Sequence, residues 1–164
     1  PYARAMAIDG IIPFLWFDTE ALEAAKFYVS LFPDSRMGDI SHYVNDAQRP
    51  KGSVLAVELE IFGQRFAALN GGPEFPHSEA ISFQMHCDTQ DEIDRIWDAL
   101  VANGGEESMC GWCKDRWGVS WQIVPKAFRE LYSGSDEVKA NRAFEAMMTM
   151  RKLDSPTFEA ILRD

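Results

Sequence analysis

An apolar run followed by a helical pattern of apolar positions occurs twice along the chain. Residues 11–17 form the first run, which ends at Asp18-Thr19, and residues 20–32 then place apolar side chains on one face of a helix. The same pair returns 70 residues later as Asp88-Thr89, again between an apolar run and a helical pattern. Either residue of the pair can cap the first turn of the following helix. The repeat predicts one module used twice.

Strand patterns complete both copies. In the first copy the remaining strands are expected at 36–44, 53–62 and 64–70, before a linker that contains Gly71-Gly72-Pro73 and Pro76. In the second copy a strand at 81–87 and a helix at 90–103 precede strands at 106–112 and 119–124, which flank a turn at 115–118. The sequence therefore predicts an α+β fold of two βαβββ modules.

The chain ends in a helical pattern alone. Helices are expected at 127–132, at 136–151 and from Ser155 onward, where Ser155-Pro156 supplies a helix start. The predicted modules are 8–72 and 78–125, followed by a helical extension over 126–164, all within one structural domain. Residues 1–7 are expected to be a frayed leader.

Composition and charge narrow the classes of partner. The net charge is −10 and the pI is about 4.7, a field that repels a phosphate backbone, so nucleic acid is not expected as a partner. No apolar run approaches the length of a membrane span and no signal peptide opens the chain, so we expect no membrane association and a cytoplasmic location.

The three cysteines raise the question of a redox or zinc site. Cys110 and Cys113 form a C-x-x-C pair, and only Cys87 and His86 are nearby candidates for further zinc ligands. The flanking residues are rich in turn formers and do not indicate a helix N-terminus. We therefore expect two thiols on a hairpin without redox or zinc function.

The duplicated module resembles the vicinal-oxygen-chelate superfamily, which includes glyoxalases, bleomycin-resistance proteins and extradiol dioxygenases. The closer resemblance is to its PhnB-like branch, which carries the label 3-demethylubiquinone-9 3-methyltransferase domain. Motifs in both copies carry the resemblance: Pro13–Asp18, Phe27-Tyr28, Phe32-Pro33, Lys51–Ser53, Phe66–Pro73, His86–Thr89, Gly104-Gly105, Gly111-Trp112, Lys114-Asp115 and Trp117–Pro125. The resemblance implies curved half-barrel sheets around a cup that binds a small organic molecule, in a homodimer.

Strand alternation sorts the side chains that face this cup. In 81–87 the odd positions are apolar, so Ser82, Gln84 and His86 are expected to face the cup. A shift of 70 residues assigns Ile12, Phe14 and Trp16 to the same face of the first copy. The predicted substrate-binding residues are those that line a half-polar, half-aromatic cup: Phe14, Trp16, Asn70, Ser82, Gln84 and Gln122.

A catalytic metal is not favoured, although a divalent ion stays possible. Metal-dependent members of the superfamily take one carboxylate from a pattern such as D-P-x-G-N-x-x-E-L, and here Gln122 stands where that Glu would be. A neutral amide is a poor ligand for a divalent ion. His86 is the cup-facing group that titrates near neutrality and is the candidate catalytic acid or base. The alternative is a histidine that only holds the strand end in place.

Methyl transfer from S-adenosylmethionine is not expected despite the family label. That cofactor's usual fold has a glycine-rich turn from strand to helix, whereas Gly71-Gly72-Pro73 leads into a linker. No cofactor is predicted.

Several functions therefore stay open. The leading one is a metal-free small-molecule binder, with or without acid–base chemistry through His86. The alternatives are a drug-sequestering resistance protein that stacks a planar ligand on Phe14, Trp16, Trp112, Trp117 and Trp121, a metal-dependent isomerase, lyase or dioxygenase, and an interaction module.

Overall fold

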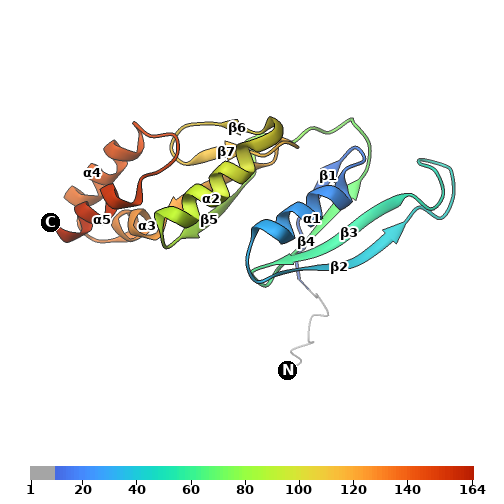
Figure 1. The fold of residues 1–164 in the computed structure, drawn as a ribbon, viewed down its shortest axis with the longest axis horizontal. Coiled ribbons are helices and arrows are strands. Elements are labelled where there is room, and N and C mark those ends of the chain that lie inside the picture. Colours follow the sequence, from blue (N-terminus) through green and yellow to red (C-terminus); the bar gives the residue numbers. More distant parts are fainter. Residues whose placement is uncertain (1–9) are drawn as a thin grey trace, which may run out of the picture. The chain divides into compact units, whose positions relative to one another are not determined.

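The computed structural model describes residues 10–164, so the expected leader at 1–7 and the start of the first predicted module lie outside the described residues. The chain divides between Phe75 and Pro76 into two compact units, called unit 1 and unit 2 below (Figure 1). No helix in the described part of the chain has the length and apolar character needed to cross a membrane.

Unit 1 is an open four-stranded sheet with one helix. Its elements are β1 (Phe14–Phe17), α1 (Ala21–Leu31), β2 (Ser35–His42), β3 (Val54–Ile61) and β4 (Gln64–Asn70). The strand order is β1-β4-β3-β2; β1 runs parallel to β4, and the other neighbours are antiparallel. α1 packs on β3 and β4 and buries the helix face that includes Tyr28 and Leu31.

Unit 2 repeats this arrangement. Its elements are β5 (Ser82–Cys87), α2 (Gln90–Val101), the 3-10 turn η1 (Ala102–Gly104), β6 (Glu106–Glu107), β7 (Trp112–Lys114) and β8 (Ser120–Pro125). The strand order β5-β8-β7-β6, with β5 parallel to β8, is the order of unit 1. The predicted α+β fold with a duplicated βαβββ module is confirmed.

The helical extension belongs to unit 2. α3 (Lys126–Ser133), α4 (Glu137–Met147) and α5 (Ser155–Arg163) surround a small apolar core. That core consists of five buried side chains: Leu131, Ala143, Leu153, Phe158 and Ile161. Lys152 in the α4–α5 loop links the extension to α2, because its ammonium pairs with Asp94 at 3.1 Å and Asp98 at 2.8 Å.

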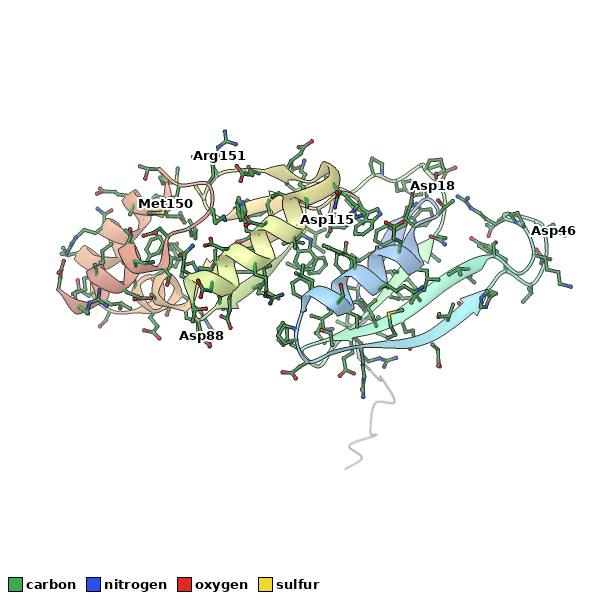
Figure 2. The ribbon with its side chains drawn as sticks, viewed as in Figure 1. Asp18, Asp46, Asp88, Asp115, Met150 and Arg151 are labelled. Atoms are coloured by element: carbon green, nitrogen blue, oxygen red, sulfur yellow. The ribbon has the colours of Figure 1, made fainter. Side chains whose placement is uncertain are left out.

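The strand predicted over 106–112 is wrong in its extent, because the structure splits it into β6 and β7. The residues between them form a turn in which Cys110 and Gly111 have positive φ. Two backbone hydrogen bonds hold this turn against the α4–α5 loop, Cys110 N to Met150 O at 2.8 Å and Gly111 N to Arg151 O at 2.7 Å. Figure 2 labels Met150 and Arg151 in that loop.

The two module helices begin in different ways. α2 has the predicted cap. The Thr89 hydroxyl accepts from the Glu92 backbone N–H, and the Glu92 carboxylate accepts from the Thr89 backbone N–H. For α1 the predicted cap is wrong, because neither Asp18 nor Thr19 caps the helix. Asn70 at the end of β4 accepts from the Ala21 N–H at 2.8 Å instead, while Asp18 pairs with Arg49 at 2.6 Å.

Candidate functional site

Four polar side chains form a continuous row on the sheet of unit 2, called the polar row below. Gln122 Nε2 lies 2.8 Å from Ser82 Oγ, and Gln84 Nε2 lies 2.9 Å from Gln122 Oε1. His86 Nε2 lies 2.9 Å from Gln84 Oε1. All four were predicted to line the cup, and the structure brings them into one hydrogen-bonded chain.

Strand register explains why these residues meet. In the parallel pair of β5 and β8, Gln84 stands directly opposite Gln122, and Ser82 stands opposite Ser120. Opposed residues share a face, so the polar row lies on one side of the sheet. α2 packs on the other side, where Cys87 and Ile123 are buried. The row is therefore on the open face, with Gln84 exposed and the other three residues half-buried.

His86 is biased toward its neutral form. Partial burial lowers the pKa of His86, and the positive charges of Arg129 and Lys126 lower it further. Lys126 also pairs with Asp88 at 2.5 Å, beside the same strand end (Figure 2 labels Asp88). A neutral imidazole has one nitrogen with a proton and one with a lone pair, so His86 can act as a proton acceptor at neutral pH.

The row is flanked by two residues, Trp112 and Ser120, of which the sequence singled out only Trp112, as a stacking residue. Trp112 on β7 stands opposite Gln122 and is half-buried, so an indole lies beside the row. At the Ser82 end, Ser120 is only 1% exposed and its hydroxyl has no hydrogen-bond partner in the described part of the chain. A buried hydroxyl without a partner is unusual in a folded protein. No local sequence signal marks it, because burial at Ser120 depends on tertiary packing.

Unit 1 carries the predicted aromatic residues. Phe14 is 61% exposed and lines a hollow of about 240 Å³ with Ile40, Ala56 and Glu58 among its other walls. Trp16 is fixed more tightly, since its indole N–H donates to Gly72 O at 2.7 Å and its ring meets Phe75 edge-on at 5.0 Å.

Gly71 is required beneath the Trp16 ring. A Cβ at Gly71 would lie 2.2 Å from a ring carbon of Trp16. The glycine pair after β4 therefore serves to seat the indole, which leaves Phe14 as the more accessible aromatic residue of this face.

Two residues that were expected near the ligand lie on the other face of their sheets. Asn70 is 5% exposed and stands opposite Phe17, and its amide is bonded to Ala21 N and Val54 O. Trp121 is 4% exposed, contacts Phe83 and donates to Asp115 Oδ2 at 3.0 Å. The expectation that Trp121 joins the other tryptophans at the mouth is wrong, because its neighbour Gln122 takes the open face.

Asp115 organises the turn that joins β7 to β8 (Figure 2). It is 2% exposed, and its Oδ1 accepts from the backbone N–H groups of Trp117 at 3.0 Å and Val119 at 3.1 Å. The predicted turn at 115–118 is confirmed, and Gly118 within it has a φ of 84°. An Asp at the first position and a Gly at the fourth were a usable sequence signal for this turn.

Among the described residues 10–164, no three His, Cys, Asp or Glu side chains converge in a geometry that could hold a metal ion. Cys87 and His86 are adjacent in β5 and point to opposite faces. Burial raises the pKa of the Cys113 thiol to about 12 and that of the Cys87 thiol to about 11. In the metal-free chain both thiols are therefore protonated at neutral pH, which is the weakly nucleophilic form.

Comparisons with known proteins show which family and which solved structures the chain matches. Residues 9–124 match the family described as 3-demethylubiquinone-9 3-methyltransferase. The PhnB protein from Bacillus cereus is 31% identical, with a TM-score of 0.64 over 70% of this chain and 98% of that one. Protein PA1353 from Pseudomonas aeruginosa is 23% identical, with a TM-score of 0.53 over 70% of this chain and 96% of its own. No curated protein matches the chain significantly.

Proposed function

The chain belongs to the 3-demethylubiquinone-9 3-methyltransferase family, a PhnB-like group with the vicinal-oxygen-chelate fold, and from this premise we propose that it binds a small organic molecule on the polar row of unit 2. The observation that carries the proposal is the unbroken chain of hydrogen bonds from Ser82 to His86 on an open sheet face. Binding sites combine apolar walls with a few convergent polar groups, and here Trp112 is the adjacent wall.

The donors and acceptors of the row favour a ligand with a flat apolar body and a polar end. Each glutamine has an amide hydrogen that the chain does not use, and Ser82 has a hydroxyl that can turn toward a ligand. The unpartnered Ser120 hydroxyl lies at the same end of the sheet. His86 would act as the acid or base if the bound molecule reacts. A drug-sequestering role fits the same site, with Trp112 and not Trp121 available for stacking.

We expect aromatic amides to bind the polar row weakly and specifically. In a titration of the ¹⁵N-labelled full chain with salicylamide, the side-chain amide signals of Gln84 and Gln122 should shift together. Gln122→Leu should weaken binding about tenfold, which corresponds to the loss of one hydrogen bond. The measurement is the dissociation constant from the signals that remain.

Gln64→Leu is the matched control, because Gln64 is exposed in unit 1 and its side chain, within the described part of the chain, bonds to the neighbouring Arg65 carbonyl alone. Shifts confined to other surfaces, or equal losses in both variants, would contradict binding at the row. Repeating the titration after EDTA treatment tests the metal-dependent alternative. Unchanged affinity supports a metal-free site, and abolished affinity supports a metal-dependent isomerase, lyase or dioxygenase.

Two features support metal-free binding over metal catalysis. Gln122 occupies the position of a carboxylate in the metal-dependent pattern, and its amide oxygen accepts from Gln84. An oxygen that already accepts a hydrogen bond on a neutral group is a weak ligand for a divalent ion.

We expect no binding of S-adenosylmethionine. The two sheets pair their strands in the order first, fourth, third, second, and neither is a doubly wound parallel sheet with a glycine-rich turn before a helix. Titration calorimetry at micromolar cofactor should give no heat beyond dilution. A saturable signal would instead support the methyl transfer that the family description names. A homodimer stays a prediction of the resemblance, and a cytoplasmic location stays a prediction from the sequence.

A further inference from the structure

The polar row has two complete hydrogen-bond arrangements on the same side-chain positions. In the first, His86 Nε2–H donates to Gln84, Gln84 donates to Gln122, and Gln122 donates to Ser82, with the distances given above. In the second, both amide groups are turned over, so Ser82 donates to Gln122, Gln122 to Gln84, and Gln84 to His86 Nε2. Amide oxygen and nitrogen have nearly the same size, so both arrangements fit.

Mixed arrangements are excluded within the row. If one glutamine turned over alone, two N–H groups or two oxygens would face each other at 2.9 Å. Such a contact loses a hydrogen bond and adds repulsion. The two glutamines therefore reverse together. Each arrangement sets whether Ser82 and His86 donate or accept a hydrogen bond at the ends of the row.

The two arrangements give Ser82 and His86 opposite hydrogen-bonding roles. The first arrangement places the imidazole proton on Nε2, leaves a lone pair on His86 Nδ1, and frees the Ser82 hydroxyl to donate. The second places the proton on Nδ1 and uses the Ser82 proton within the row, so Ser82 can only accept. Ser82 and His86 are four residues apart on one strand, which spans roughly 13 Å.

We propose that Gln84 and Gln122 form a two-state switch, by which the group bound at Ser82 sets the tautomer of His86. This proposal rests on the proposed function, because the bound group is part of the ligand. A carbonyl or carboxylate oxygen at Ser82 selects the first arrangement and gives a basic lone pair at Nδ1. An ammonium group at Ser82 cannot accept the Ser82 proton, so the hydroxyl donates within the row, which is the second arrangement with its proton-donating Nδ1–H. Carbonyl compounds are thus the ligand class for which His86 is set up as a base.

The charges around His86 disfavour the imidazolium, so the two forms that compete are the neutral tautomers. Lys126 and Arg129 on α3 disfavour the imidazolium, while Asp88 at the strand end is paired with Lys126. The imidazolium donates from both nitrogens and is compatible only with the first arrangement. A measurement above the ordinary pKa of histidine therefore isolates the switch.

The test uses ring ¹⁵N shifts of His86 in the free, full-length chain at pH 8, with His42 and His77 as internal references. Ser82→Asp places at the far end a carboxylate that can only accept. We expect the ratio of Nε2–H to Nδ1–H tautomer to rise about tenfold, the ratio that one ordinary hydrogen bond supplies. In a Gln84→Met background, where the row is cut, Ser82→Asp should leave the ratio unchanged.

Comparing the two backgrounds removes the direct field of the new carboxylate, which acts equally in both. Gln84 is exposed, so Gln84→Met should keep the fold, and backbone spectra check this. Gln122→Glu is a second variant that forces the same tautomer from the middle of the row, with Gln64→Glu as its charge control. Equal effects with and without Gln84, or no effect of either carboxylate, would overturn the switch. Because no ligand is used, this failure is separate from failure to bind salicylamide.

Discussion

Asp115→Ala should lower the free energy of unfolding of unit 2 by about 3–5 kcal/mol, the largest effect that we expect from a single substitution. The carboxylate accepts from two backbone N–H groups and from the Trp121 indole N–H in a buried turn. Each buried donor left without a partner costs about 1–3 kcal/mol. The turn also sets the start of β8, so its loss should loosen the strand that carries Gln122.

Urea unfolding followed by tryptophan fluorescence measures this effect, since Trp97, Trp112, Trp117 and Trp121 all lie in unit 2. Asp115→Asn should lower the free energy of unfolding less than Asp115→Ala, because the amide oxygen can still accept from the two backbone N–H groups. The remaining loss comes from its NH₂ group, which faces the indole N–H and cannot accept from it. Glu130→Gln, an exposed carboxylate-to-amide change in the same unit, should cost almost nothing. Equal stability of Asp115→Ala and Glu130→Gln would refute the structural role of Asp115.

Asn70→Ala should destabilise unit 1 by about 2–4 kcal/mol, since it leaves one buried and one partly buried backbone group without their Asn70 partners. The lost bonds are those to the Ala21 N–H at 2.8 Å and to the Val54 carbonyl at 3.1 Å. The Ala21 N–H begins α1, so its hydrogen-exchange protection should collapse toward that of an uncapped helix end. Exchange measured by NMR at Ala21 reports on unit 1 alone.

Two further variants test the structural role of Asn70. Asn70→Asp keeps an acceptor for Ala21 but no donor for Val54, so its loss should be smaller than that of Asn70→Ala. Asn45→Ala is the control, because Asn45 is exposed in a loop of the same unit and, among residues 10–164, its side chain bonds to the Ala47 N–H alone. If Asn70→Ala keeps both its stability and its Ala21 protection, Asn70 does not hold the start of α1.

The Asp115 prediction bears on how the candidate site is held. Asp115 and Gln122 are seven residues apart, on the turn and strand that position Gln122, the member of the polar row that lies on β8. Destabilising the turn should weaken binding only through loss of folded protein, whereas Gln122→Leu should weaken binding at unchanged stability. Stability and affinity measured on the same samples therefore distinguish a residue that supports the row from one that contacts the ligand.

The sequence by itself determined the repeated module, most strand positions and the polar face of β5. These features have local causes: an alternation of period two puts Ser82, Gln84 and His86 on one side, and a period near four marks the helices. The Asp115–Gly118 turn also has a local cause, an Asp at its first position and a Gly at its fourth. The family resemblance then identified Gln122 as a cup residue, at the position of a metal-binding carboxylate.

The tertiary structure alone decided which residues close the gaps between these elements. The cap of α1 comes from Asn70, 49 residues away, because β4 ends beside the helix start and not because of any signal near Thr19. Strand register, which pairs Gln84 with Gln122 and turns Trp121 to the buried face, follows from hydrogen bonds between distant segments. The split between β6 and β7 likewise depends on the backbone of the α4–α5 loop. Contacts of this kind leave no periodic trace, since their energy appears only when both partners are folded.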